Sequence, residues 1–232
     1  MSQKALVLES AKTPFVLKSI QSLALVDLGV QARDIFPKIT YPTVLGLDVA
    51  GDVEELGEGV EGYAKGDRVF FAAAYTTNNG GFQQYALKTI SDSDIGKIPP
   101  QISYSEASSI PMNFATAAIP LLSANPVGSG LNPTFDSKVS FSGEVALVIG
   151  TIPVGQFAIQ IFKYLGFSTI ITYASSKDLD YLKSLGATHI IERTEVPFST
   201  IPEAVKAITP LPIKNIYLAI IVVPEAFDAR YA

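Results

Sequence analysis

The sequence contains no cysteine and no tryptophan, and His189 is its only histidine. Without cysteine the chain can form no disulfide, no thiolate zinc site and no cysteine nucleophile. One histidine cannot build the histidine clusters that commonly bind catalytic metals. Thiolate and imidazole metal sites are therefore excluded as a basis for function, and we predict no metal site.

The sequence also has a small net charge and no long apolar segment. The 232 residues include 17 basic and 22 acidic side chains, a net charge of −5, whereas a nucleic-acid partner usually requires a basic face. The longest apolar run, residues 216–223, is too short to span a bilayer. The N-terminal residues lack the apolar core of a signal peptide. We therefore expect a soluble, cytoplasmic protein that binds neither nucleic acid nor a membrane.

Residues 145–187 carry the most informative pattern, which is strand, glycine turn, helix, strand and helix. The apolar run 145–149 is typical of a buried parallel strand. Gly150 closes that strand, and Gly155 opens a helix whose apolar residues recur at helical spacing. Two parallel strands joined by a helix, with a glycine turn at the mouth, usually hold a nucleotide's phosphates. The segment therefore predicts dinucleotide binding.

The two ends of the chain differ in organisation. Up to residue 110, short alternating runs with frequent glycines predict an antiparallel β domain, with strands at 49–56 and 68–71. A capping box of Ser103 and Glu106 predicts a helix over 104–110, and an apolar helix follows over 113–122. A long loop over 125–143 then leads into the glycine-turn segment. After that segment we expect strands at 189–191 and 216–222 and helices at 177–185 and 202–208, a continuing parallel β-α-β series.

One stretch, PTVLGLDVAGDVEELGEGVEGYAKGDRVF at 42–70, resembles the signature of the medium-chain dehydrogenase/reductase superfamily. Residues 80–122 and 181–191 follow the same family pattern in order. The most similar branch is the zinc-free enoyl/quinone reductase-like group, which includes fungal trans-acting enoyl reductases. The resemblance implies an α/β chain with a GroES-like catalytic domain over 1–124, internally shortened. A partial Rossmann NADP-binding domain, doubly wound and parallel, is implied over 125–232.

The same resemblance implies an activity. Zinc-free members are NADPH-dependent oxidoreductases that transfer a hydride to an activated C=C bond of an enone, enoyl or quinone-like substrate. The expected partner is thus a small-molecule substrate, and a homodimer is a further option. Where zinc-dependent members carry a His-Glu pair, this chain has Leu47 and Asp48. No catalytic residue is identified from the sequence.

Three departures from the family pattern support an alternative, a catalytically inactive, shortened member of the family. The middle glycine of the phosphate turn is Ile152, and Pro153 removes an N–H that could face a phosphate. The family motif that faces the nicotinamide is reduced to residues 24–29, without its Asn, Trp and Lys. The sequence ends at Ala232, before the remaining Rossmann strands.

Cofactor-binding residues are expected in three places, each with a simpler reading. In the turn, Gly150, Thr151, Val154 and Gly155 either cradle a diphosphate or only make a tight strand–helix connection. No acid that would bind an NAD ribose stands at the end of the second strand, so Ser175, Ser176 and Lys177 are predicted to hold the 2′-phosphate of NADPH.

The simpler reading of this second place is that Ser176 caps a helix and Lys177 is solvated. The third place is Thr116, which either contacts the cofactor, as the resemblance implies, or lies in a helix core. Asp48, Asp52 and His189 are interpreted as structural.

Overall fold

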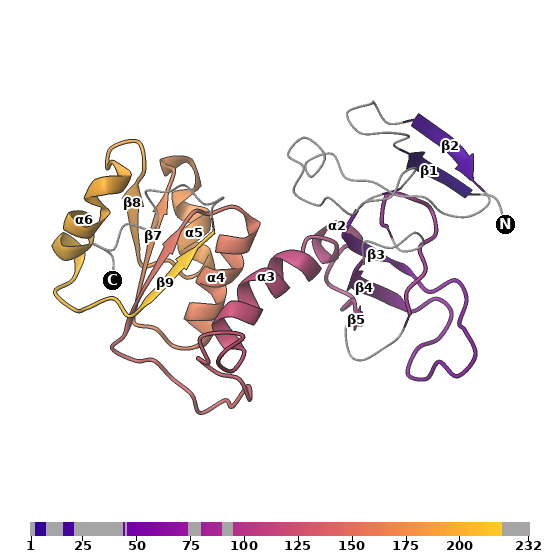
Figure 1. Cartoon of the computed structure of the whole chain (residues 1–232), viewed down its shortest axis with the longest axis horizontal. Helices are drawn as coiled ribbons and strands as arrows, with labels where there is room; N and C mark the ends of the chain where they lie inside the picture. The colour runs from indigo at the N-terminus through magenta and orange to yellow at the C-terminus, as the bar shows by residue number, and fades with distance from the viewer. Residues whose placement is uncertain are drawn as a thin grey trace. The chain divides into compact units, whose positions relative to one another are not determined.

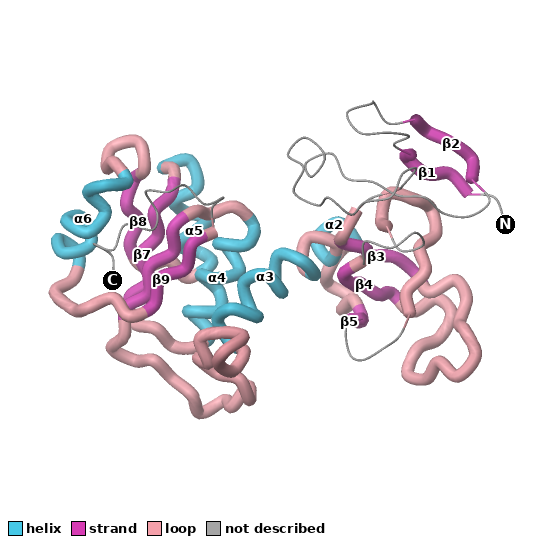
Figure 2. The backbone as a smooth tube through the Cα atoms, viewed as in Figure 1, coloured by secondary structure: helices cyan, strands magenta, loops and turns pink. Residues whose placement is uncertain are grey.

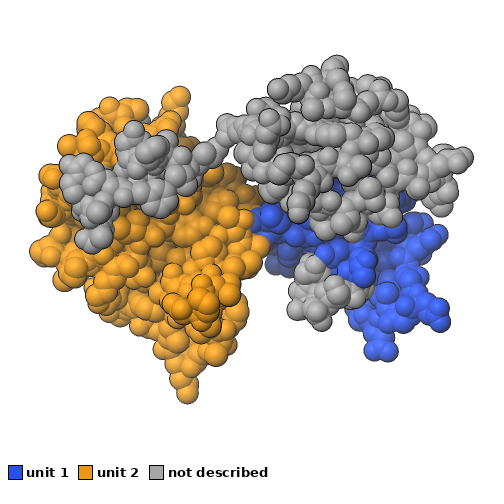
Figure 3. Space-filling view, viewed as in Figure 1, with its two compact units in different colours: residues 1–112 blue, residues 113–232 orange. Residues whose placement is uncertain are grey.

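The computed structural model describes residues 3–7, 16–20, 44, 46–73, 80–89 and 95–219. The chain is divided into two compact units, residues 1–112 and residues 113–232 (Figures 1 and 3). Among the described residues, the first unit contains two sheets and the second unit contains one. The reduced motif at residues 24–29 lies outside the described residues.

The first unit is an antiparallel β structure. Its described residues include the strands β1 (Gln3–Val7), β2 (Val16–Ile20), β3 (Asp48–Asp52), β4 (Arg68–Ala72) and β5 (Ile95–Lys97). β1 pairs with β2, and β3, β4 and β5 form a second sheet in that order, with every pairing antiparallel. The antiparallel domain predicted from the sequence is confirmed.

The first strand predicted in that sheet is shorter than expected. β3 ends at Asp52 instead of continuing to residue 56. The N–H of Val53 donates to the carbonyl of Asp67 (2.9 Å), and the N–H of Gly66 donates to the carbonyl of Val53 (2.8 Å). Gly66 has φ +87°, a conformation that favours glycine. The chain therefore leaves the strand at Val53, and the longer prediction was wrong because alternation alone does not reveal this turn.

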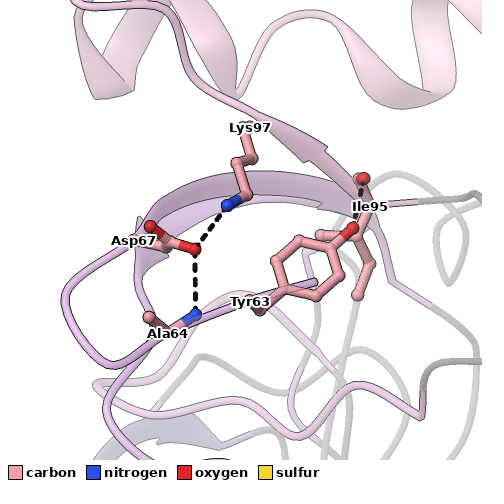
Figure 4. A network of polar contacts seen from close by, with 5 residues as sticks. All are labelled: Tyr63, Ala64, Asp67, Ile95 and Lys97. Carbon is pink, nitrogen blue, oxygen red and sulfur yellow. Dashed lines mark hydrogen bonds and ion pairs between the residues drawn. The ribbon is translucent and has the colours of Figure 1, made fainter. Parts of the chain in front are cut away.

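A polar network fixes the return of the chain into β4 (Figure 4). Asp67 Oδ2 accepts a hydrogen bond from the N–H of Ala64 (2.9 Å) and forms an ion pair with Lys97 Nζ (2.7 Å). These two contacts, that with Lys97 above all, hold the pKa of Asp67 below its usual value. Tyr63 Oη donates to the carbonyl of Ile95 (2.9 Å). The network joins the turn to β5 and so fixes the register of β4 and β5.

The second unit is built on a parallel sheet with helices on both faces (Figures 1 and 2). Its strands are β6 (Val145–Ile149), β7 (Thr169–Ala174), β8 (His189–Glu192) and β9 (Asn215–Leu218). Its helical elements are α3 (Pro111–Leu122), which begins at the end of the first unit, α4 (Pro153–Tyr164), η1 (Ser176–Asp178), α5 (Leu179–Leu185), η2 (Phe198–Thr200) and α6 (Ile201–Ile208).

The central strand β6 shows why a continuous apolar run predicts a parallel strand. All five of its residues are buried. Ala146 and Val148 pack with residues of α3, α4 and α5 on one face of the sheet. Val145, Leu147 and Ile149 pack with residues of α6 on the other face. Helices therefore cover both faces of the sheet, and a strand with alternating polar residues could not occupy this place.

The strand order places a switch point beside β6. All pairings are parallel and the order is β8-β7-β6-β9, which is the order 3-2-1-4 of a doubly wound sheet. The predicted β-α-β series is thus confirmed, although residues 220–222 of its last predicted strand lie outside the described residues. In such sheets, ligands bind beyond the carboxyl ends of the strands where the order reverses. Here that point lies between β6 and β9.

Candidate functional site

The turn between β6 and α4 lies at this switch point. Gly150 has φ +91°, which an L side chain rarely adopts. Ile152 is in extended backbone, φ −62° and ψ 166°, where any residue is tolerated. Pro153 begins α4, in the first turn, where a missing N–H breaks no helical hydrogen bond. The two departures from the glycine pattern therefore leave the strand–turn–helix geometry intact.

Gly155 is required by close packing. A Cβ atom at this position would lie 2.0 Å from the carbonyl oxygen of Gly150 and 3.1 Å from the Cβ of Ala219, the residue after β9. Helix α4 therefore approaches the carboxyl ends of both β6 and β9 at a distance that only glycine allows. This is the packing role of the last glycine in a dinucleotide turn. Contact with a cofactor remains a prediction.

The first turn of α4 presents free hydrogen-bond donors. The N–H groups of Val154 and Gly155 have no acceptor within the helix, and none is found for them in the described part of the chain. The positive end of the helix dipole adds to their attraction for an anion. Thr151, two residues before the helix, has its carbonyl tied to Gln156 Nε2 (3.0 Å). The turn therefore presents N–H donors of the kind that bind anionic groups at helix N-termini.

The end of β7 carries the residues predicted to hold a 2′-phosphate. Ser175 follows the strand, and its side chain makes no capping hydrogen bond. Ser176 begins η1, and Asp178 precedes α5, so Ser176 is not the cap of that helix. Lys177 is exposed, and within the described ranges it forms no ion pair. A basic group is thus available beyond the strand that neighbours the glycine turn.

Arg193 is a second exposed basic residue at this edge of the sheet, and sequence reasoning missed it. It follows β8, and its N–H donates to the carbonyl of Ala174, the last residue of β7 (2.9 Å). Glu192, one residue earlier, accepts hydrogen bonds at Oε1 from the N–H and hydroxyl of Thr194 (both 3.1 Å). Only the parallel pairing of β7 and β8 places Arg193 beside the Ser175–Lys177 segment. Sequence reasoning could have found Arg193 only by predicting that these two strands are neighbours.

Thr116 lies on the exposed side of α3. Its carbonyl accepts a hydrogen bond from Tyr217 Oη on β9 (2.7 Å). Burial raises the pKa of that tyrosine hydroxyl. Two residues earlier on α3, the ring of Phe114 meets Phe157 of α4 edge-on, with centroids 5.7 Å apart. Thr116 is therefore fixed against β9, the strand on the far side of the switch point from β7, and its contact with a cofactor remains a prediction.

The carboxylates of the signature stretch hold the first unit together. Asp48 Oδ1 accepts a hydrogen bond from the N–H of Met112 (2.6 Å), in the first turn of α3. Asp52 Oδ1 accepts from Tyr104 Oη (2.5 Å). The guanidinium of Arg68 lies 4.5 Å from the centre of the Tyr104 ring. Both carboxylates are thus engaged in structural contacts, as the sequence interpretation expected.

The contact of Asp48 predicts a pH-dependent contribution to stability. Partial burial raises the pKa of Asp48 despite the hydrogen bond from Met112. The folded chain therefore binds this proton more tightly than the unfolded chain, and the stability from Asp48 falls as pH rises from 3.8 through the raised pKa. Asp48→Asn keeps an acceptor for the N–H but cannot titrate. Denaturant unfolding from acidic to neutral pH should show a flatter profile, with unchanged or slightly higher stability at neutral pH.

Asp48→Ala is the companion variant for this prediction. It removes the acceptor for the Met112 N–H and should lower the free energy of unfolding by about 1 kcal/mol, the usual cost of losing a helix cap. A pH profile for Asp48→Asn identical to that of the wild type would contradict the role given to Asp48.

Tyr173 and His189 also make polar contacts within the second unit. Tyr173 Oη donates to the carbonyl of Val196 (2.8 Å), and burial raises the pKa of this hydroxyl. His189 begins β8, is exposed, and its Nδ1 lies 3.0 Å from the hydroxyl of Thr188.

No group of three or more His, Cys, Asp or Glu side chains able to hold a metal ion occurs among the described residues. None of the helices in the described ranges combines the length and the apolar character needed to cross a bilayer.

The alcohol dehydrogenase GroES-like domain family matches residues 19–100. Over 205 residues the chain is 32% identical to a dehydrogenase, azaJ, of Aspergillus niger, covering 82% of this chain and 57% of that protein. It is 32% identical over 204 residues to a trans-enoyl reductase, tazE, of Aspergillus terreus, covering 82% of this chain and 64% of the relative. The chain thus spans somewhat more than half the length of these curated relatives.

Solved structures share the fold. A quinone oxidoreductase from Coxiella burnetii superposes with a TM-score of 0.66 at 24% identity, covering 93% of this chain and 68% of that one. A mycobacterial protein complexed with NADPH gives a TM-score of 0.66 at 22% identity, covering 93% and 66%. The antiparallel first unit and the parallel second unit are therefore a GroES-like domain and a Rossmann-type sheet in sequence.

Proposed function

Because the chain belongs to the medium-chain dehydrogenase/reductase family, we propose that it is an NADPH-dependent oxidoreductase. Its substrate is a small molecule with an activated C=C bond, such as an enone, an enoyl thioester or a quinone-like compound. The observation that carries the proposal is the glycine turn at the switch point, where α4 directs two free N–H groups beyond the end of β6.

The choice of NADPH over NADH rests on charge at the neighbouring strand ends. Lys177 and Arg193 are exposed beyond β7 and β8, and the segment from Tyr173 to Lys177 contains no acid for an NAD ribose. The first acidic residue after β7 is Asp178, which directly follows Lys177. A cationic group at this place favours a 2′-phosphate. One structural neighbour is complexed with NADPH and another is an NAD-dependent alcohol dehydrogenase, so the choice rests on the residues of this chain.

The residues of this chain would bind and orient the cofactor. The N–H groups of Val154 and Gly155 would hold the diphosphate, and Ser175, Ser176 and Lys177 the 2′-phosphate, with Thr116 as a further contact. The bound cofactor would supply a hydride for the substrate's C=C bond. Leu47 and Asp48 stand where zinc-dependent members have metal ligands, so we propose a reaction without zinc. A homodimer and a cytoplasmic location stay predictions from the sequence.

Oxidation of NADPH tests this proposal. The purified chain would be mixed with NADPH and, in turn, an enone, an enoyl thioester and a quinone, and loss of reduced cofactor followed by absorbance. Turnover with at least one acceptor, faster with NADPH than with NADH, is the expected result. Binding of NADPH without turnover of any acceptor would favour the alternative, a catalytically inactive family member.

A further inference from the structure

A chain of hydrogen bonds links α5 to the glycine turn. The side chain of Gln156, on the first turns of α4, donates from Nε2 to the carbonyl of Thr151 (3.0 Å). Its Oε1 accepts from Tyr181 Oη on α5 (3.3 Å). Gln156 is half-buried, whereas Tyr181 is 52% exposed. One amide side chain therefore connects a residue of the turn with a helix more than twenty residues further along the chain.

Holding the carbonyl of Thr151 fixes the next N–H. In a trans peptide the C=O and N–H groups point in opposite directions. With the Thr151 carbonyl directed to Gln156, the N–H of Ile152 faces away from Gln156. No acceptor for that N–H exists among the described residues. The contact thus orients a third free donor, beside those of Val154 and Gly155.

We infer that Gln156 is a positioning residue for the diphosphate of the dinucleotide, and that Tyr181 holds Gln156 in place. The inference rests on the function proposed above. Pro153 has no N–H to offer, and the turn lacks its middle glycine, so it has fewer and less adaptable donors than the usual pattern. By fixing the peptide between Thr151 and Ile152, Gln156 makes up for that loss.

Substitution of Gln156 by methionine tests the inference. Gln156→Met keeps the length of the side chain but removes both hydrogen bonds. The Kd of NADPH and the Kd of NADH should rise equally, by about tenfold, because the loss concerns the shared diphosphate. Tyr181→Phe should raise both values by about two- to threefold, since its hydrogen bond is longer and exposed. In the Gln156→Met background it should add nothing, because Tyr181 acts through Gln156.

Gln160→Met is the matched control. Gln160 lies one turn further on the same helix and donates from Nε2 to the carbonyl of Gln156, without touching the turn. This variant should bind both cofactors like the wild type. Thermal unfolding of each variant without ligand shows whether it folds. If Gln156→Met does not fold, the change in cofactor Kd caused by Tyr181→Phe tests the inference instead, because this variant loses only a single exposed hydroxyl.

A ligand without a diphosphate separates positioning from general damage. Adenosine 2′-monophosphate carries the 2′-phosphate alone, and ADP-ribose carries the diphosphate. Gln156→Met should weaken the binding of ADP-ribose by about tenfold and leave the binding of adenosine 2′-monophosphate unchanged. Equal loss for both ligands, or unchanged ADP-ribose binding, would overturn the inference while the proposed function stands. A wild-type chain that binds neither NADPH nor NADH would overturn both.

Discussion

Replacing Gly155 with alanine is expected to lower the free energy of unfolding of the chain by about 3 kcal/mol, the upper end of the usual cost of overpacking. The new Cβ would lie 2.0 Å from a backbone oxygen, that of Gly150, and 3.1 Å from the Cβ of Ala219. No side chain can rotate away to relieve the first contact, so α4 must move from the ends of β6 and β9. Denaturant unfolding followed by circular dichroism measures the change.

The same displacement should remove cofactor binding, because the N–H groups of Val154 and Gly155 move with the helix. Gly57→Ala is the control: its φ is not positive and the nearest atom to a Cβ there is 3.9 Å away. That substitution should change the free energy of unfolding by no more than about 0.5 kcal/mol. Wild-type stability in Gly155→Ala would show that α4 does not pack against the strand ends as described.

Lys177→Ala should weaken NADPH binding by about 10- to 100-fold and leave NADH binding unchanged. The expected loss corresponds to one hydrogen bond to a charged group, about 1.5–3 kcal/mol. NADH lacks the 2′-phosphate and so offers Lys177 no partner. Titration of the chain with each cofactor, followed by fluorescence, gives the two Kd values. The preference of the wild type for NADPH should also decline as ionic strength rises, because Lys177 is exposed.

Lys183→Ala is the matched control for this variant. Lys183 is an exposed lysine on α5 with no ion pair among the described residues. Its substitution by alanine removes the same charge as Lys177→Ala. Both cofactors should bind Lys183→Ala as they bind the wild type. Equal weakening of NADPH and NADH by Lys177→Ala would contradict the assignment of Lys177 to the 2′-phosphate.

Elements with strong local signals were predictable from the sequence. β6 was predicted at its observed bounds because a run of five apolar residues between a turn and Gly150 leaves little choice. The capping box of Ser103 and Glu106 was also correct, with both hydrogen bonds formed, although α2 (Tyr104–Ala107) is shorter than expected. Where alternation was the only signal, as in β3, the predicted strand was too long.

Contacts between distant residues account for the parts of the site that the sequence could not reveal. Gln156 and Tyr181 are common residue types, and only the packing of α4 against α5 shows that they bond. Arg193 follows a strand that is second from β6 in the sheet, so its neighbourhood depends on the strand order. The sequence identified Gly155 as a residue of the turn. The reason why glycine is needed there, the close approach of α4 to Ala219, is visible only in the folded structure.

Thermal unfolding of the 232-residue chain with and without NADPH shows directly whether the folded chain binds the cofactor. At a concentration of 100 times its Kd, a ligand of the folded state adds about 2.7 kcal/mol of stability. We expect a clear rise in Tm with NADPH and a much smaller rise with NADH at the same concentration. A cooperative transition whose Tm is the same with NADPH, with NADH and without ligand would contradict the proposed cofactor site.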